Sequence, residues 1–151
     1  MKKIYTFFSI LILSTMSLAD QNYDVGIGTN YGGLLGGTVS VDLNENTEIF
    51  GGLGLTLGDS VGSVIGAKFW VNDSIRLTGN YGYNCTVKTI STTTTYKDYY
   101  GLNVGAGYSF GGKDSNGVAV DLMLIDSSDC SKAAGSSESS SSVKITAGYR
   151  F

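Results

Sequence analysis

The stretch Val143-Lys144-Ile145-Thr146-Ala147-Gly148-Tyr149-Arg150-Phe151 alternates between two kinds of residue. Its odd-numbered positions are apolar or aromatic, and its even-numbered positions are polar, cationic or glycine. Successive side chains of a β-strand point to opposite faces, so this period of two predicts a strand with one apolar face and one polar face. The alternation continues to the last residue of the sequence.

Seven upstream segments show the same alternation, and we expect each of them to form a strand. They cover residues 23–31, 35–43, 48–57, 64–71, 75–84, 99–110 and 118–125. Each is about as long as the 9–11 residues that a tilted strand needs to cross a bilayer. Proline removes a hydrogen-bond donor from a sheet, and the sequence contains none.

The N-terminal residues 1–19 have the features of a cleaved signal peptide. Lys2 and Lys3 precede an apolar run over residues 4–16, and Ser17-Leu18-Ala19 fits a cleavage site. The alternative, a membrane anchor, is disfavoured because the run is shorter than the roughly 20 apolar residues of a spanning helix. We therefore expect export and a mature domain over residues 20–151.

The connections between the expected strands alternate in length. Residues 44–47, 72–74 and 111–116 are short polar turns, whereas 85–98 and 126–142 are the longest stretches outside the strands. Short turns at one rim and long loops at the other are typical of outer-membrane barrels, and strands can cross a bilayer only as a closed barrel. The sequence predicts an all-β fold, an antiparallel up-and-down transmembrane barrel of eight strands in a bacterial outer membrane.

The polar faces of these strands carry charges of both signs in equal number. The expected lumen charge network comprises Asp24, Asp42, Glu48, Lys68, Arg76, Asp121, Lys144 and Arg150. Because buried charge is tolerated only when paired, we expect a neutral, side-chain-filled lumen and no wide pore. Aromatic residues of the apolar faces predict two membrane-interface belts: Tyr23, Phe69, Phe110, Tyr149 and Phe151 at one rim, and Tyr31, Tyr81, Tyr83 and Tyr100 towards the other.

These features together resemble the small eight-stranded outer-membrane barrels of the OmpX and OmpA transmembrane-domain type. The resemblance covers the whole mature chain and rests on the signal peptide, the eight segments and the aromatic C-terminal strand. It implies that outer-membrane lipid and the barrel-assembly machinery are partners. The assembly signal would be carried by Val143, Ile145, Ala147, Tyr149 and Phe151.

The two cysteines, Cys85 and Cys130, fall in the two long loops. Export permits oxidation, so we expect a disulfide that ties these loops together, the alternative being two free thiols. Loops 85–98 and 126–142 are also rich in threonine and serine, and they are candidate contact surfaces for a host or cell-surface partner.

Catalytic and cofactor sites are not expected. The sequence has no histidine to serve as a base beside a serine nucleophile, and Asp126 with Asp129 lacks the spacing of a calcium loop. The mature chain has a formal charge of −5, which disfavours nucleic-acid binding. We expect no enzyme, cofactor or metal, and a structural or surface-interaction role. The alternatives are a narrow pore for small solutes and a secreted soluble barrel that binds an apolar ligand.

Overall fold

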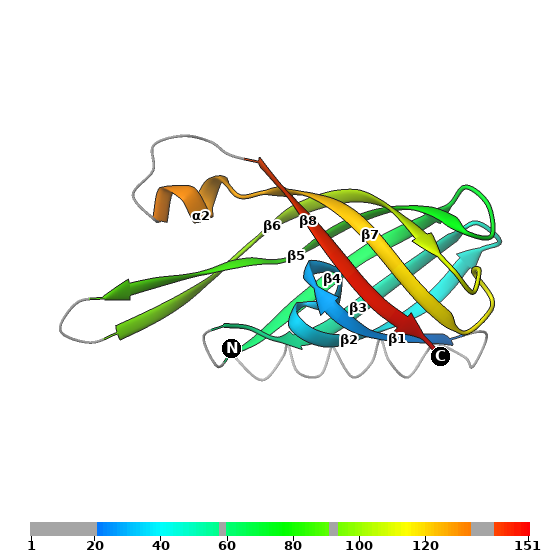
Figure 1. The fold of residues 1–151 in the computed structure, drawn as a ribbon, viewed down its shortest axis with the longest axis horizontal. Helices are drawn as coiled ribbons and strands as arrows, with labels where there is room; N and C mark the ends of the chain where they lie inside the picture. Colours follow the sequence, from blue (N-terminus) through cyan, green and yellow to red (C-terminus); the bar gives the residue numbers. More distant parts are fainter. Residues whose placement is uncertain (1–20, 58–59, 91–93, 134–140) are drawn as a thin grey trace, which may run out of the picture.

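Eight antiparallel strands form a closed barrel in the computed structural model, which describes residues 21–57, 60–90, 94–133 and 141–151 (Figure 1). The strands are β1 Gln21–Gly28, β2 Gly33–Asn44, β3 Thr47–Leu55, β4 Val61–Trp70, β5 Ile75–Ile90, β6 Thr94–Ser109, β7 Gly117–Asp126 and β8 Ser141–Arg150. Each strand pairs with the next in sequence, and β8 returns to β1. The predicted up-and-down barrel is confirmed, whereas the expected signal peptide over residues 1–19 lies outside the described residues.

The distribution of apolar and charged side chains is the reverse of that in a soluble protein. Leu53, Val104 and Ile145 are 62%, 58% and 67% exposed on the outer wall. In contrast, Lys68 and Arg76 are only 4% and 3% exposed, inside the lumen. The predicted assignment of apolar faces to the outside and ionic faces to the inside is therefore confirmed. Within the described ranges, no helix has the length and apolar character needed to cross a bilayer.

The barrel closes at a short seam between β1 and β8. The seam pairs residues 24–27 with residues 147–150, and Phe151 adds a backbone hydrogen bond from its N–H to the carbonyl of Tyr23, at 2.9 Å. Tyr149 and Phe151 point outwards and stack edge to face, with ring centroids 5.1 Å apart. This end of the barrel also bears Tyr23, Phe69 and Phe110, all exposed, so the aromatic belt predicted at this rim is present.

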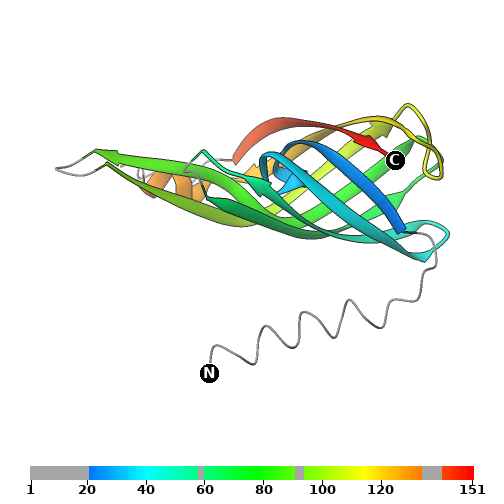
Figure 2. The same ribbon diagram turned by 90° about the horizontal axis from the view of Figure 1, so that it is seen from below.

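The segment predicted as a loop over residues 85–98 is instead a continuation of the sheet. A bulge separates Tyr83 from Cys85, and beyond it the ladder continues to the pair Ile90 and Thr94. The two strands project from the barrel as a ribbon, seen in both views (Figures 1 and 2). The loop prediction was wrong because a threonine-rich composition was taken to indicate irregular structure. Threonine is β-branched, and β-branched residues favour strands. Residues 91–93, at the tip, lie outside the described residues.

The second predicted loop, 126–142, contains a short helix. The helix α2 spans Ser128–Ala133, and β8 begins at Ser141, two residues before its predicted start. Residues 134–140 lie outside the described part of the chain. We call this end of the barrel the loop side. The opposite end, which carries the connections β2–β3, β4–β5 and β6–β7, is called the turn side.

The connection from β1 to β2 folds into the barrel. After Gly28 the chain forms the 3₁₀ turn η1, Thr29–Tyr31, and all three of its side chains are buried. Gly28 and Gly32 flank η1 with φ of 102° and 76°, values that glycine adopts without strain. The prediction of Tyr31 as an outward belt residue was therefore wrong, and Tyr83, at 5% exposed, is buried as well.

Candidate functional site in the barrel lumen

A four-membered ionic network fills the turn side of the lumen. Arg150 donates to Asp24 at 2.8 Å through Nε and to Glu48 at 2.8 Å through Nη2. Lys68 donates to Asp24 at 2.6 Å and lies 3.8 Å from Glu48. All four side chains are at most 5% exposed, so each charge is compensated inside the wall. Arg150 and Asp24 are also opposite each other in the β1–β8 ladder, so this network ties the seam that closes the barrel.

A second ion pair lies beside the first network. Arg76 donates to both carboxylate oxygens of Asp121, at 2.9 and 2.8 Å, the two-pronged geometry that makes such pairs strong. The guanidinium groups of Arg76 and Arg150 both lie over the Trp70 ring, 5.5 and 5.4 Å from its centroid. The Trp70 Nε1 donates to Glu48 at 2.8 Å. The indole therefore links the two ionic groups into one layer.

The turn between β6 and β7 adds a further ion pair at the turn-side end of the lumen. The ammonium of Lys113 lies 3.3 Å from Asp42 and donates to the Glu45 carbonyl at 2.8 Å. The Lys113 carbonyl in turn accepts from Arg150 at 2.8 Å. The sequence prediction had not included Lys113, because it lies in a turn and follows no strand period. Lys144 was expected in the network but pairs with no carboxylate of the described residues.

A neutral polar layer follows further towards the loop side. Asn30 of η1 donates to Thr146 at 3.1 Å and accepts from Asn80 at 2.8 Å. Asn103 donates to the Asn80 carbonyl oxygen at 2.9 Å. The three asparagines are no more than 4% exposed. The β1–β2 turn is thus anchored inside the barrel by side chains of β5, β6 and β8, and we call it the plug.

Glycines of the wall make room for the aromatic ring of the plug. A Cβ atom at Gly148 would lie 2.0 Å from the Tyr31 hydroxyl, and one at Gly26 would lie 2.6 Å from the ring. At Gly36 and Gly54 a Cβ would meet the Tyr31 carbonyl at 1.9 and 2.4 Å. These separations are too short for real contacts, so the plug requires glycine at these wall positions.

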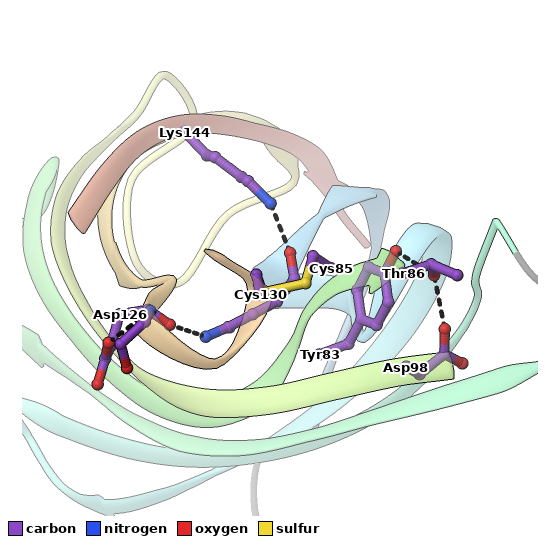
Figure 3. Close-up of a disulfide and its surroundings, with 9 residues drawn as sticks. Tyr83, Cys85, Thr86, Asp98, Asp126, Cys130 and Lys144 are labelled. Atoms are coloured by element: carbon purple, nitrogen blue, oxygen red, sulfur yellow. Dashed lines mark hydrogen bonds between the residues drawn. A yellow bond between two sulfur atoms is a disulfide. The ribbon is translucent and has the colours of Figure 1, made fainter. Parts of the chain in front are cut away.

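The loop-side mouth lies beneath a disulfide. Cys85 of β5 and Cys130 of α2 are joined, with Cα atoms 6.3 Å apart, as predicted from the cysteine count (Figure 3). Lys144 reaches from β8 to donate to the backbone carbonyl of Asn84 at 2.5 Å. The Asn84 amide donates to the carbonyl of Asp126 at 2.8 Å. Strands β5, β7 and β8 and helix α2 are thereby connected around this opening.

A carboxylate anchors the base of the projecting ribbon. Asp98 accepts from Thr56 at 3.0 Å and from Thr86 at 2.5 Å, and it also accepts from Ser60. Partial burial acts to raise the pKa of Asp98, but the hydrogen bonds from Ser60, Thr86 and Thr56 hold it below its usual value. Tyr83 shares a 2.9 Å hydrogen bond with Thr86 and extends the cluster towards the mouth.

Several apolar lumen residues were not named as lumen residues from the sequence. Phe50, Trp70, Met123 and Ile125 are all at most 3% exposed. The sequence could have predicted their position, because each lies an even number of residues from a predicted inward-facing charge in the same strand and therefore shares its face. Among residues 21–57, 60–90, 94–133 and 141–151, no three metal-binding side chains come together.

One solved structure is similar to this chain: the N-terminal β-barrel domain of Pseudomonas aeruginosa OprF. The TM-score is 0.52, the sequences are 12% identical, and the match covers 88% of this chain and 98% of the OprF domain. No family model matches the sequence, and no curated protein matches it. At this identity the likeness concerns the fold, so the chain has the eight-stranded, OmpA-type barrel architecture that its sequence resembles.

Proposed function

We propose that this protein is an integral outer-membrane barrel with a structural or surface-interaction role, and that it is not an enzyme. The observation that carries the proposal is the inverted surface: the wall exposes large apolar side chains on every strand, and the ionic residues are inside. Such a wall costs free energy in water and gains it in hydrocarbon. Bacterial export through the predicted signal peptide over residues 1–19 completes this assignment.

Membrane extraction tests the location. The protein is expected to remain with the outer membrane through high-salt washing and to need detergent for release. It should also migrate faster on a gel before boiling than after, because the folded barrel resists the detergent. Release by salt alone would contradict the proposal and favour the secreted soluble barrel. That alternative is already disfavoured, since ion pairs occupy the space in which an apolar ligand would lie.

The lumen favours a closed barrel over the narrow-pore alternative. Moving along it, a solute would meet the Lys113 turn, two ionic groups and the plug. Eight-stranded barrels enclose a space that side chains can fill. We therefore expect no stable, large openings in planar lipid bilayers, whereas regular openings of uniform size would support transport.

The surface role is assigned to the two loop-side projections, the β5–β6 ribbon and the β7–β8 connection with α2. The ribbon exposes Tyr96 at 47% and carries two lysines over tyrosine rings, at 5.9 Å for Lys88 on Tyr96 and 5.2 Å for Lys97 on Tyr99. Tyrosine is enriched at protein interfaces, so the exposed tyrosines of the ribbon favour a contact surface. Replacing residues 86–97 by a two-residue turn should leave membrane insertion intact and abolish cell-surface adhesion. Unchanged adhesion would contradict a role of the ribbon in surface contacts.

The C-terminal strand is assigned the role of assembly signal. Val143, Ile145, Tyr149 and Phe151 are 40–67% exposed on the outer face of β8, where assembly machinery could contact them. Ala147 belongs to the same face. Removing the Phe151 ring by Phe151→Ser should slow insertion into the outer membrane, and an unchanged insertion rate would contradict this role.

A further inference from the structure

An apolar groove crosses the outer wall of the barrel from β3 to β7, and its volume is about 710 Å³. The residues along its turn-side edge follow one row of cross-strand pairs: Thr47, Phe69, Leu77, Ala106 and Leu122. The next row towards the loop side contributes Ala67, Gly79, Val104 and Leu124. The groove therefore runs across the strands, along the direction of their hydrogen bonds.

The groove rises from the turn-side rim into the wall. Thr47 is the first residue of β3 on the turn side, whereas Leu122 and Leu124 lie in the loop-side half of β7. Four strand spacings of about 4.8 Å make the groove roughly 19 Å long. Strands of such barrels tilt by about 35–45°, so the groove rises by roughly 11–14 Å, close to the roughly 15 Å of hydrocarbon in one leaflet. Its length and slope suit one acyl chain.

Gly79 gives the groove its depth, and no contact inside the protein requires glycine there. A Cβ atom added at Gly79 would meet nothing within 4 Å, whereas one at the inward-facing Gly148 would strike Tyr31. The cross-strand neighbour of Gly79, Ala67, is small as well. A glycine in a strand interior weakens the strand and often marks a site that another molecule approaches closely.

The turn-side end of the groove is polar. Thr47 brings a hydroxyl group to this end, and it lies opposite Phe69 in the β3–β4 ladder. Phe69 belongs to the turn-side aromatic belt, which marks the boundary between hydrocarbon and headgroups. A lipid whose acyl chain follows the groove would therefore have its phosphate near Thr47.

The turns beside this end carry negative charge. Glu45, two residues before Thr47, is exposed, as are Asp73 and Asp114 in the other two turns. None of these three carboxylates forms an ion pair within the described residues, and Lys113, the cation of these turns, pairs with Asp42. The rim therefore attracts a headgroup that carries a positive charge and repels an anionic one.

We propose that the groove binds one phospholipid with an ammonium-bearing headgroup, such as phosphatidylethanolamine. The proposal rests on the outer-membrane location proposed above and names the class of lipid that this wall selects. One acyl chain lies along Ala67 and Gly79, and the phosphate accepts a hydrogen bond from the Thr47 hydroxyl. The ammonium lies beside the Glu45 carboxylate, and the second acyl chain stays in the surrounding bilayer.

Native mass spectrometry of the purified protein in detergent tests the proposal. The barrel should retain one molecule of phosphatidylethanolamine, and the anionic phosphatidylglycerol should bind at least about threefold more weakly. Equal or tighter binding of phosphatidylglycerol, or retention of several lipids without a step at one, would overturn the proposal. A lipid-free dimer of barrels would assign the groove to a second copy of the chain and would overturn it as well.

Two leucine variants locate the acyl chain. Gly79→Leu fills the groove and should weaken phosphatidylethanolamine binding by at least about tenfold. Gly51→Leu is the matched control, because Gly51 is exposed on β3 outside the groove, and a Cβ there would meet the Val64 carbonyl oxygen at 3.9 Å. Faster gel migration before boiling checks that both variants fold. Equal affinity of the two variants would contradict the assignment to the groove.

A charge variant tests the headgroup. Glu45→Gln should lower the preference for phosphatidylethanolamine over phosphatidylglycerol by about threefold, the modest effect of an exposed ion pair. Asp129→Asn removes the same charge from the loop side, where the Asp129 side chain is 66% exposed, and should leave the preference unchanged. An unchanged preference in Glu45→Gln would contradict the role of this carboxylate.

The outcome of this test is distinguishable from a failure of the proposed location. Release of the protein from membranes by salt alone would contradict the location itself. A protein that needs detergent for release but retains no phosphatidylethanolamine would contradict the groove as a lipid site and leave the location intact.

Discussion

The two ends of the lumen differ in how their charges are compensated. On the turn side, Asp24, Glu48, Lys68 and Arg150 neutralise one another behind a turn that supplies Lys113. On the loop side, Lys144 donates to the Asn84 carbonyl and pairs with no carboxylate of the described residues, and the disulfide and the plug hold this end together. Buried ion pairs hold the turn side in one arrangement, whereas the loop side carries the projecting β5–β6 ribbon and α2. We infer that the turn side supports the barrel and that the loop side is the end that interacts.

The largest expected effect comes from breaking the turn-side network. Arg150→Met removes the donor that the buried carboxylates of Asp24 and Glu48 share, so the free energy of unfolding should fall by about 3–5 kcal/mol. Urea unfolding in lipid vesicles measures this. The loop-side control Lys132→Met should change it by less than about 0.5 kcal/mol. Equal losses of unfolding free energy in the two variants would contradict the stabilising role of the turn-side network.

The disulfide should contribute the next largest effect, on the loop side. Replacing both Cys85 and Cys130 by serine opens a closed segment with a sequence separation of 45 residues, and unfolding should become easier by about 2–4 kcal/mol. Protease should also cut near α2 sooner, since the bridge holds this helix against β5. The same urea experiment measures the loss. If the double variant unfolds like the wild type and α2 stays protected, the bridge does not stabilise the loop side.

A smaller effect is expected at the plug, which lies between the two ends, and it tests one contact, that of Gly148 with Tyr31. Gly148→Ala places a methyl group against the Tyr31 ring and should cost about 1–3 kcal/mol of stability. The same change in a Tyr31→Ala background should cost less, because the ring is gone, although the Val25 carbonyl oxygen, 2.7 Å from the added Cβ, remains in its way. A double-mutant cycle measures this coupling. Additive effects would show that the Tyr31 ring does not lie against Gly148.

The smallest effect concerns pH at the base of the ribbon. The pKa of Asp98 is lowered in the folded state, so the ionised form stabilises the ribbon base above the ordinary aspartate pKa of about 3.9. This contribution is lost as pH falls through the lower, folded-state pKa. The protection factor of amides near Thr86, which corrects for the intrinsic pH dependence of exchange, should therefore fall at low pH in the wild type and stay constant in Asp98→Asn. An identical pH response in both proteins would exclude Asp98 as the cause.

Strand periodicity predicted which side chains of the barrel wall face outwards, because a side chain on a strand can lie on only one of two faces. The alternation around Ile145, Val104 and Lys68 thus correctly separated outward-facing from lumen-facing residues. Turns have no such period. The inward fold of Thr29–Tyr31 depends on glycines of distant strands. The contribution of Lys113 depends on a contact with Asp42, far away in the sequence, and neither could be derived from local pattern.

The lipid contacts of individual methyl groups test the central claim most directly. In NMR spectra of the protein in lipid nanodiscs, methyl groups of Leu53, Val104 and Ile145 should show cross-relaxation with lipid acyl chains. Met123 and Ile125 are the matched controls, because they are equally apolar but are 0% and 1% exposed inside the barrel. They should show no lipid contacts. Acyl-chain contacts at Met123 and Ile125, with Ile145 contacting water, would contradict an outward apolar wall around an ionic lumen.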